Sequence, residues 1–443
     1  MNAVAEDKDA LRSSFERFAA AHAASDPAWL RERRTAAFAR YVLSGLPGPR
    51  DEAWRHTPSG PLTKTRFEPA AEAPPEPAVL ALAPRLDGPL AVVINGRLAP
   101  ELSRLEGAAG VEVSGLRELL RREPAVLEPL LGRVLAADAS VFAHLNTAFA
   151  ADGVVVRVAP GAVVPQPIHV VHLAAGGGPP AVSYTRTLLV AGRASESTLV
   201  ETFAGADGRG YLVNAVSEVV VEDGAHVDHY KLQREGAAGL HVATLAMRLA
   251  RDARLVDHSL ALGAALARSD VDLRFEGEGG EALLEGLFVV DGRRVADTHL
   301  RVDHRAARCT SRQLYKGILD EQARGVFNGL VVVRPGAQKT DAAQTNRNLL
   351  LSREALVHST PQLEILADDV KCRHGSTTGQ LDDTALFYLR SRGIGEAAAR
   401  SLLSWAFASD LLRSLRVRPV REAVERHLQA HLPGVATVEE ALA

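Results

Sequence analysis

Cys372 and His374 are the two residues whose types and spacing most directly predict chemistry in this chain. Residues two apart on a β-strand point to the same face, so this thiol and imidazole would stand side by side, their bases about 6.5–7 Å apart. Together they favour iron, copper or zinc, as a single ion or in a cluster. Lys371 and Arg373 would point to the opposite face, yet their charges could still lower the pKa of the thiol.

Two ligands do not complete a four-coordinate site, and Cys309 is the only other cysteine in the sequence. A site at Cys372 and His374 must therefore be shared with another subunit, completed by water, or occupied only transiently. Hence no tightly bound cofactor is expected. Two alternatives remain open: a small buried cysteine beside a hydrogen-bonded histidine, and a Cys–His catalytic dyad.

Three Val-Asp-His tripeptides, which end at His229, His258 and His304, are a second candidate constellation. If a repeating fold placed these histidines in register, they could form a metal-binding ladder. Polar side chains that recur in a solenoid are more commonly structural rungs, and we favour that interpretation.

Acidic pairs raise a third possibility, a β-helix enzyme that acts on carbohydrate or acyl substrates. The pairs are Asp368–Asp369 and Asp382–Asp383. Adjacent acids in turns more often cap helices or stay solvated, so this enzyme is the alternative function and not the leading one. The sequence contains no Gly-x-x-x-x-Gly-Lys-Ser/Thr loop, which excludes a P-loop ATPase, and no Gly-x-Ser-x-Gly elbow.

The composition is that of a soluble globular protein, with 47% hydrophobic and 24% charged residues and a formal net charge of −3. A near-neutral chain is unsuited to coating nucleic acid. The N-terminus lacks the basic and apolar regions of a signal peptide, and the longest apolar run, near 260–267, is shorter than the ~20 residues of a membrane span. Two cysteines do not make a disulfide framework, so we expect a cytoplasmic protein.

The 443 residues are too many for one ordinary core and divide into a repetitive middle between two helical ends. From 153 to 381, runs of β-branched residues alternate with small turns such as Ala191–Arg193 and Asp223–Ala225, at a period of roughly 27 to 32 residues. This pattern predicts a mainly β protein with a β-helix or related β-solenoid core. A large β-sandwich is the competing interpretation.

Apolar residues at helical spacing predict helices on both sides of that core, where they would cover the ends of a solenoid. In the first part, Asp26 is expected to cap a helix that begins at Pro27. The last part is expected to hold a helix capped by Asp382–Thr384 that runs through Arg390, a second over 396–415 and a third from Pro419 to about Leu432. The expected divisions are a helical segment (1–67), a Pro-rich linker (68–78), a small mixed α/β and helical segment (79–152), the β-helix (153–381) and a C-terminal helical domain (382–443).

An ordered set of motifs resembles the SufB/SufD family, the scaffold subunits of the SUF iron–sulfur cluster assembly machine. The motifs are Asp51–Thr57, Leu145–Phe149, Phe327–Gly329, Pro335–Asp341, Gln344–Ser352, Cys372–Thr377 and Leu389–Ile394. The resemblance implies a right-handed parallel β-helix flanked by N-terminal and C-terminal helical domains. It also implies a scaffold that is not an enzyme, with the associated ATPase activity in a partner chain.

Two positions favour the SufD branch of this family. SufB carries a glutamate directly after the histidine and a cluster-building cysteine in the stretch that corresponds to 346–352, whereas this chain has Gly375 and no cysteine there. The resemblance then implies pairing with a SufB-like paralogue through the C-terminal end of the β-helix, a homodimer as an option for the isolated chain, and a part in iron acquisition. Cys372 and His374 would contribute ligands for transient iron or a nascent cluster at that subunit interface.

The resemblance also implies that the C-terminal helical domain binds a SufC-like ATPase, and Arg390 to Leu415 is the expected docking surface. The residues expected to contact the ATPase are Arg390, Arg392, Gly393, Leu402, Leu403 and Phe407. Ordinary packing of a wide apolar helix face is the alternative. Neither nucleic acid nor a membrane is expected as a partner.

Overall fold

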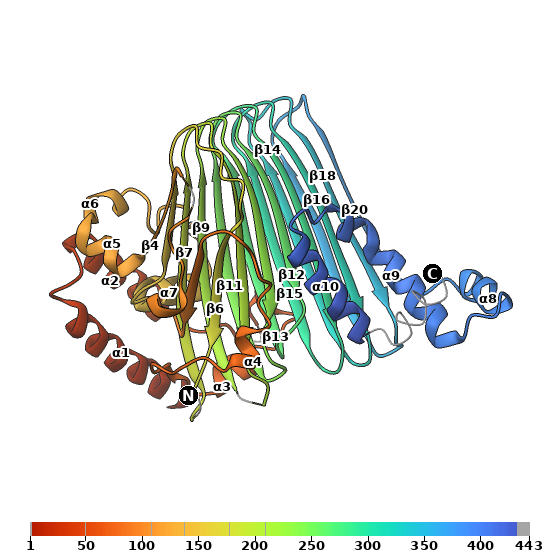
Figure 1. Cartoon of the computed structure of the whole chain (residues 1–443), viewed down its shortest axis with the longest axis horizontal. Coiled ribbons are helices and arrows are strands. Elements are labelled where there is room, and N and C mark those ends of the chain that lie inside the picture. Colours follow the sequence, from red (N-terminus) through yellow and green to blue (C-terminus); the bar gives the residue numbers. More distant parts are fainter. Residues whose placement is uncertain are drawn as a thin grey trace.

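A flattened β-solenoid forms the core of the molecule, and helices lie toward both ends of the chain (Figure 1). The computed structural model describes residues 2–48, 50–107, 109–136, 138–176, 178–208 and 210–431, with side chains from residue 11 onward. Two sheets lie face to face, and the chain alternates between them, so that each solenoid turn adds one strand to each sheet.

The strand order and register establish the solenoid. The first sheet runs β19 (Leu356–Ile365), β17 (Arg324–Val333), β15 (Val295–His304), β13 (Leu266–Phe275), β11 (Gly239–Leu249), β9 (Tyr211–Val221), β7 (Ala181–Ala191), β5 (Val154–Val158), β4 (Val111–Gly115). The second runs β20 (Lys371–Gly379), β18 (Asp341–Leu350), β16 (Thr310–Leu319), β14 (Glu281–Val290), β12 (Arg254–Ala261), β10 (His226–Arg234), β8 (Glu196–Gly205), β6 (Ile168–Ala174), β2 (Leu90–Ile94), β3 (Arg97–Leu98). Within the described residues, strands β5 to β20 pair with one another only in parallel, and β5 also pairs antiparallel with β4 at the start of the sheet.

Neighbouring residues such as Arg254 and Glu281, or Thr310 and Asp341, are separated by one period of the sequence, roughly 27 to 32 residues. The predicted β-solenoid is therefore confirmed. The competing β-sandwich is wrong, because such sandwiches are built from antiparallel strands.

Inward-facing columns of apolar residues fill the space between the two sheets. Val227, Leu255 and Ala282 stand beside one another in successive turns and are almost fully buried. Gly224 and Asp252 occupy equivalent turns with φ of 66° and 55°, a left-handed conformation that glycine adopts freely and aspartate tolerates. The alternation of buried runs with such turns explains why the period is visible in the sequence.

The N-terminal helices cover the outer face of the first sheet around an aromatic cluster. α1 (Asn2–His22), α2 (Ala28–Ser44) and α7 (Val141–Phe149) supply Phe15, Phe38 and Phe149, which pack with sheet residues including Val242. The Phe15 and Phe38 rings stack with centroids 4.2 Å apart. The remaining elements of this part are η1 (Glu52–Trp54), α3 (Gly60–Lys64), β1 (Glu68–Pro69), which pairs with β7, α4 (Pro77–Leu80), η2 (Pro100–Leu102), α5 (Leu116–Arg122) and α6 (Pro124–Leu127).

The expected cap at Asp26 is wrong. α2 begins at Ala28 with Pro27 as its N-cap, and the Asp26 carboxylate accepts a hydrogen bond from Nε of Arg34 at 2.8 Å. Both side chains are buried, and an unpaired buried arginine costs more free energy than a helix end without a side-chain cap. The carboxylate therefore pairs with Arg34.

Three helices complete the described chain. α9 (Glu396–Ser414) and α10 (Arg418–His431) lie on the outer face of the second sheet, where Leu411, Leu415 and Val424 pack against Tyr230 and Ile318. α8 (Asp383–Ser391) projects beyond the end of the solenoid (Figure 1) and buries none of its residues. The three predicted helices are present, although Leu432 lies outside the described residues. In the part of the chain that the structure describes, no helix combines the length and apolarity needed to cross a membrane.

Candidate functional site

The solenoid ends in two strands that have no further strand beyond them. β19 and β20 are the last strands of their sheets, so each presents unpaired N–H and C=O groups along one edge. Ile365 of β19 lies beside Val333, a core residue that is 0% exposed, yet Ile365 itself is 43% exposed. The apolar interior of the solenoid therefore opens to solvent at this end, and Leu366, 49% exposed, extends the apolar surface.

Cys372 and His374 lie in the open layer, on β20. Cys372 stands beside Ala342 and His374 beside Gln344, and both of these neighbours are buried in the solenoid interior. One turn later the same inward face is uncovered: Cys372 is half-buried against the interior cluster, and His374 is exposed. The structure thus brings the thiol and the imidazole to one face at the end of the solenoid.

The thiol of Cys372 is held in its protonated form by its surroundings. Burial raises its pKa, and the negative charge of Asp341 adds to the effect. Arg312 lowers the pKa of Asp341, and Lys371 and Arg373 contribute to the same shift. The expectation that Lys371 and Arg373 lower the pKa of the thiol is therefore wrong. Their charges instead lower the pKa of Asp341 on the neighbouring strand β18.

Polar residues line the interior just behind the open layer. Gln344 donates from Nε2 to Oε1 of Gln313 at 2.7 Å, and both amides are buried. Ser376 of β20 donates to Ser359 of β19 at 2.8 Å, which joins the two edge strands. The sequence did not single these residues out, since a glutamine is recognisable as an interior residue only once the register of its strand is known.

A buried ionic network occupies the middle of the solenoid. His229 contacts Oδ1 of Asp257 through Nδ1 at 2.7 Å and Oε2 of Glu201 through Nε2 at 3.0 Å, and all three side chains are at most 1% exposed. Burial lowers the pKa of His229, but its hydrogen bonds and the charges of the two carboxylates outweigh burial and raise the pKa to about 9.

The proposed ladder of three histidines does not form. His229 lies beside Asp257, whereas His258 lies beside Tyr230. His304 belongs to β15, in the other sheet. Among the described residues, no three His, Cys, Asp or Glu side chains are grouped so that they could hold a metal ion.

The residues expected to dock an ATPase fall into two environments. Arg390 and Arg392 lie at the projecting end of α8, where Arg390 pairs with Glu396 at 3.5 Å, and Gly393 follows in the turn. Leu402, Leu403 and Phe407 lie on α9 and are half-buried. The Phe407 ring lies 4.8 Å from the ammonium group of Lys316, which also donates to the Phe407 carbonyl at 2.7 Å.

Phe407 therefore packs against the solenoid, and the helix-packing alternative fits that residue. The exposed aromatic residues are Phe387 and Tyr388 of α8, 73% and 57% exposed, which the sequence reasoning did not include. The guanidinium of Arg392 lies 5.1 Å from the centroid of the Tyr388 ring. The sequence feature that could have identified them is two adjacent aromatic residues in a short helix directly after the last strand.

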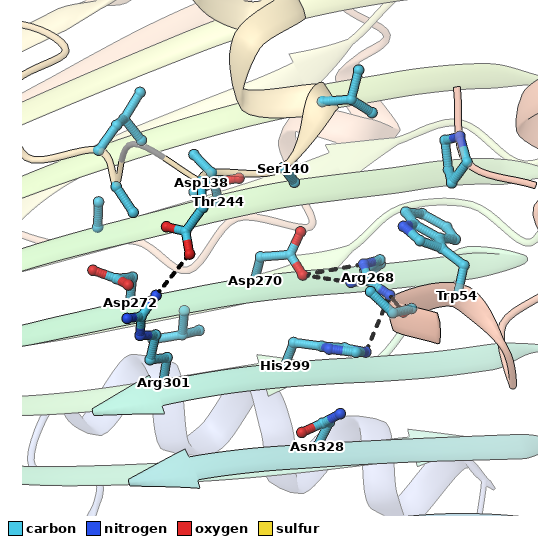
Figure 2. Close-up of a pocket in the computed structure, with 18 of the residues that line it drawn as sticks. Trp54, Asp138, Ser140, Thr244, Arg268, Asp270, Asp272, His299, Arg301 and Asn328 are labelled. Atoms are coloured by element: carbon cyan, nitrogen blue, oxygen red, sulfur yellow. Dashed lines mark hydrogen bonds and ion pairs between the residues drawn. The ribbon is translucent and has the colours of Figure 1, made fainter. Parts of the chain in front are cut away.

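A cleft of about 630 Å³ lies on the side of the solenoid, between its first sheet and the N-terminal segment. Figure 2 shows that its charged side chains turn toward one another: Arg268 pairs with Asp270 at 2.8 Å and Arg301 with Asp138 at 3.1 Å. Arg268 also donates to the carbonyl of Ala53 at 2.8 Å. These groups fasten the N-terminal segment to the sheet, which favours a structural role for the cleft over that of an enzyme's substrate site.

The fold and the site define the class of the protein: a parallel β-solenoid with flanking helices and an open end that presents a cysteine and a histidine. Two family models match the chain: "SUF system FeS cluster assembly, SufBD core domain" over residues 172–407, and "SufBD protein N-terminal region" over residues 6–170. The chain belongs to the SufB/SufD family.

Its relatives favour the SufD branch. The chain is 34% identical over 398 residues to the iron-sulfur cluster assembly protein SufD of Escherichia coli, which covers 89% of this chain and 91% of that protein. It is 32% identical over 378 residues to an iron-sulfur cluster assembly SufBD family protein of Synechocystis, 83% of each chain. It is 29% identical over 397 residues to the chloroplastic protein ABCI7 of Arabidopsis thaliana, 87% of this chain and 82% of that one. The resemblance identified in the sequence is confirmed, and with it a role in SUF iron–sulfur cluster assembly.

Proposed function

We propose that this chain is a non-catalytic scaffold subunit that pairs with a SufB-like paralogue through the open end of its solenoid. The observation that carries the proposal is the uncovered interior at β19 and β20, where Ile365, Cys372 and His374 continue buried columns into solvent. A second solenoid end set against this one would cover the apolar residues and satisfy the two free strand edges.

Cys372 and His374 supply half of a ligand set for iron or a nascent cluster, which is the cargo of the assembly. A thiolate and an imidazole suit iron, and the remaining ligands come from the partner. The raised pKa of Cys372 keeps the thiol protonated until a metal ion approaches, and metal coordination then displaces the proton. The site therefore takes up iron with release of a proton, which fits a part in iron acquisition.

α8 and the start of α9 form the docking surface for a SufC-like ATPase. Phe387 and Tyr388 offer exposed aromatic contacts, and Arg390 and Arg392 offer charges beside them. Aromatic and arginine side chains are the residues that most often dominate binding energy at interfaces. Lys316 of β16 ties α9 to the sheet through Asp410, so that movement of the docked helices would act on the strands that lead to the open end.

A reconstituted assembly tests the proposal. The full chain is mixed with a SufB-like and a SufC-like protein, and light scattering measures the mass of the complex with and without ATP, while absorbance follows cluster formation. Cys372→Ser combined with His374→Ala should leave the mass unchanged and reduce cluster yield at least tenfold. Cys309→Ser, a thiol buried inside the solenoid, is the matched control and should leave both unchanged. Full cluster yield from the double variant would overturn the ligand role, and a chain that stays alone would overturn the scaffold role.

A further inference from the structure

A cleft lined by arginine and histidine side chains lies where the last turn of α10 meets the turns of the solenoid. It has a volume of about 590 Å³ and lies at the turns that follow β8, β10, β12 and β14, and no residue of β20 lines it. The basic side chains on its walls are three arginines, Arg234, Arg293 and Arg294, and two histidines, His427 and His431. The turns also bring glycine backbone into the wall at Gly236, Gly263 and Gly292.

The acidic residues of the cleft are already engaged. Glu235 is buried and accepts from Nδ1 of His241 at 2.7 Å, and Asp291 pairs with Arg294. Asp207 accepts from the N–H of Ala237 at 2.7 Å. Among the described residues, none of these three carboxylates lies within ion-pair distance of Arg234.

Arg234 is left without a counter-ion. Within the described ranges no carboxylate oxygen lies within 4.0 Å of it, and its Nη1 donates a hydrogen bond to the carbonyl of Leu82 at 2.7 Å. Burial lowers the pKa of Arg234, and the charge of Arg426 on α10 lowers it further. A half-buried guanidinium that faces a second cation is costly unless an anion joins them.

His427 points to the same conclusion. Its Nε2 is buried and has no hydrogen-bond partner in the described structure, and its ring stacks on His431 with centroids 3.9 Å apart. Burial, followed by the charges of His431, Arg234 and Arg294, lowers the pKa of His427 to about 3. The imidazole is thus a neutral group close to two arginines. Among the described residues, no group donates a hydrogen bond to its Nε2 or accepts one from it.

We propose that this cleft binds a phosphate-bearing small molecule, a function beyond the assembly role of the open end. Guanidinium groups donate in a planar fork that matches phosphate oxygens, and the imidazole supplies a further donor from α10. These donors come from two directions, from a helix and from the turns of the sheet. A tetrahedral oxyanion can receive bonds from both, whereas a planar carboxylate offers only two oxygens in one plane.

Calorimetric titration of the full chain with inorganic phosphate, and separately with pyrophosphate, at fixed ionic strength tests the proposal. We expect saturable binding of one molecule, weakened at least tenfold in Arg234→Met and in Arg293→Gln. Arg293 lines the cleft from an exposed turn, so its substitution leaves the core intact. Arg251→Met, an exposed arginine near Asp223 at other turns, is the matched control and should bind as the unmodified chain does.

Two kinds of result would overturn the proposal. Heat that does not saturate, or that is equal in Arg234→Met and Arg251→Met, would show only general attraction of anions. Acetate that binds as tightly as phosphate would make this a carboxylate site.

Discussion

Replacing His229 by glutamine should remove most of the pH dependence of stability between about pH 6.5 and 8. His229 is fully buried between Glu201 and Asp257, and its pKa in the folded protein is raised to about 9 from an ordinary value of 6.5. In this pH range the folded protein keeps a proton on His229 that the unfolded chain releases. The stabilisation is complete below pH 6.5 and is lost as the pH rises toward 9.

The magnitude follows from the width of the window. Each pH unit costs about 1.4 kcal/mol, so the unmodified protein should lose about 2 kcal/mol of unfolding free energy between pH 6.5 and 8. Above pH 8 an opposite contribution begins, because burial lowers the pKa of Lys231 to about 8 from 10.5. The contribution of Lys231 to the unfolding free energy rises with pH between about 8 and 10.5, so the total unfolding free energy should level off there.

Chemical denaturation at several pH values from 6.5 to 8, followed by circular dichroism, measures both quantities. His229→Gln should be about 3–5 kcal/mol less stable near pH 6.5, since two buried carboxylates lose their cation, and its stability should vary little across the range. His304→Gln is the control: burial lowers the pKa of His304 to about 4, so this variant should keep the unmodified slope. An equal slope in His229→Gln and the unmodified chain would refute the reasoning.

Three further predictions concern the surfaces and the interior. Leu366→Glu should leave the unfolding free energy within about 0.5 kcal/mol and weaken pairing with a SufB-like partner about tenfold, measured by light scattering, because Leu366 is exposed beside the free strand edge. Phe387→Ser with Tyr388→Ser should likewise spare stability but weaken ATPase binding at least tenfold in a surface-binding assay; unchanged affinity would remove α8 from the docking surface. Gly286→Ala should destabilise by about 1–3 kcal/mol in urea denaturation, because a Cβ there would stand 2.3 Å from the buried Tyr315 ring.

The solenoid was predictable because its signal is local and repeated. Turns such as Asp223–Ala225 require a left-handed residue, and the β-branched runs between them fit pleated strands, so the period survives in the sequence. The predicted cap at Asp26 was wrong because Arg34, in the second turn of the same helix, binds its carboxylate. A helix-start pattern carries no information about such a tertiary partner.

The candidate site was predictable in part for the same reason. Cys372 and His374 are two residues apart, so one strand sets their common face without reference to the rest of the fold. The pKa of the thiol was misjudged, since it depends on burial against the interior cluster and on Asp341, one full turn earlier. The amide rung formed by Gln313 and Gln344 was missed because register, which sequence period fixes only approximately, decides which residues are neighbours.

Under the proposed function, the chemistry of the open end links partner pairing to metal binding. A partner that covers the end without iron would bury His374 and enclose Cys372 more deeply, with no ligand to satisfy either group, which costs free energy. If iron occupies the layer, the same burial strengthens its bonds and excludes competing water. Iron must then raise the affinity of the two subunits for each other by the same factor by which pairing raises the affinity for iron, because the two equilibria share one thermodynamic cycle. An isolated chain with half a ligand set would hold iron weakly, and the assembled pair would hold it until the interface is opened.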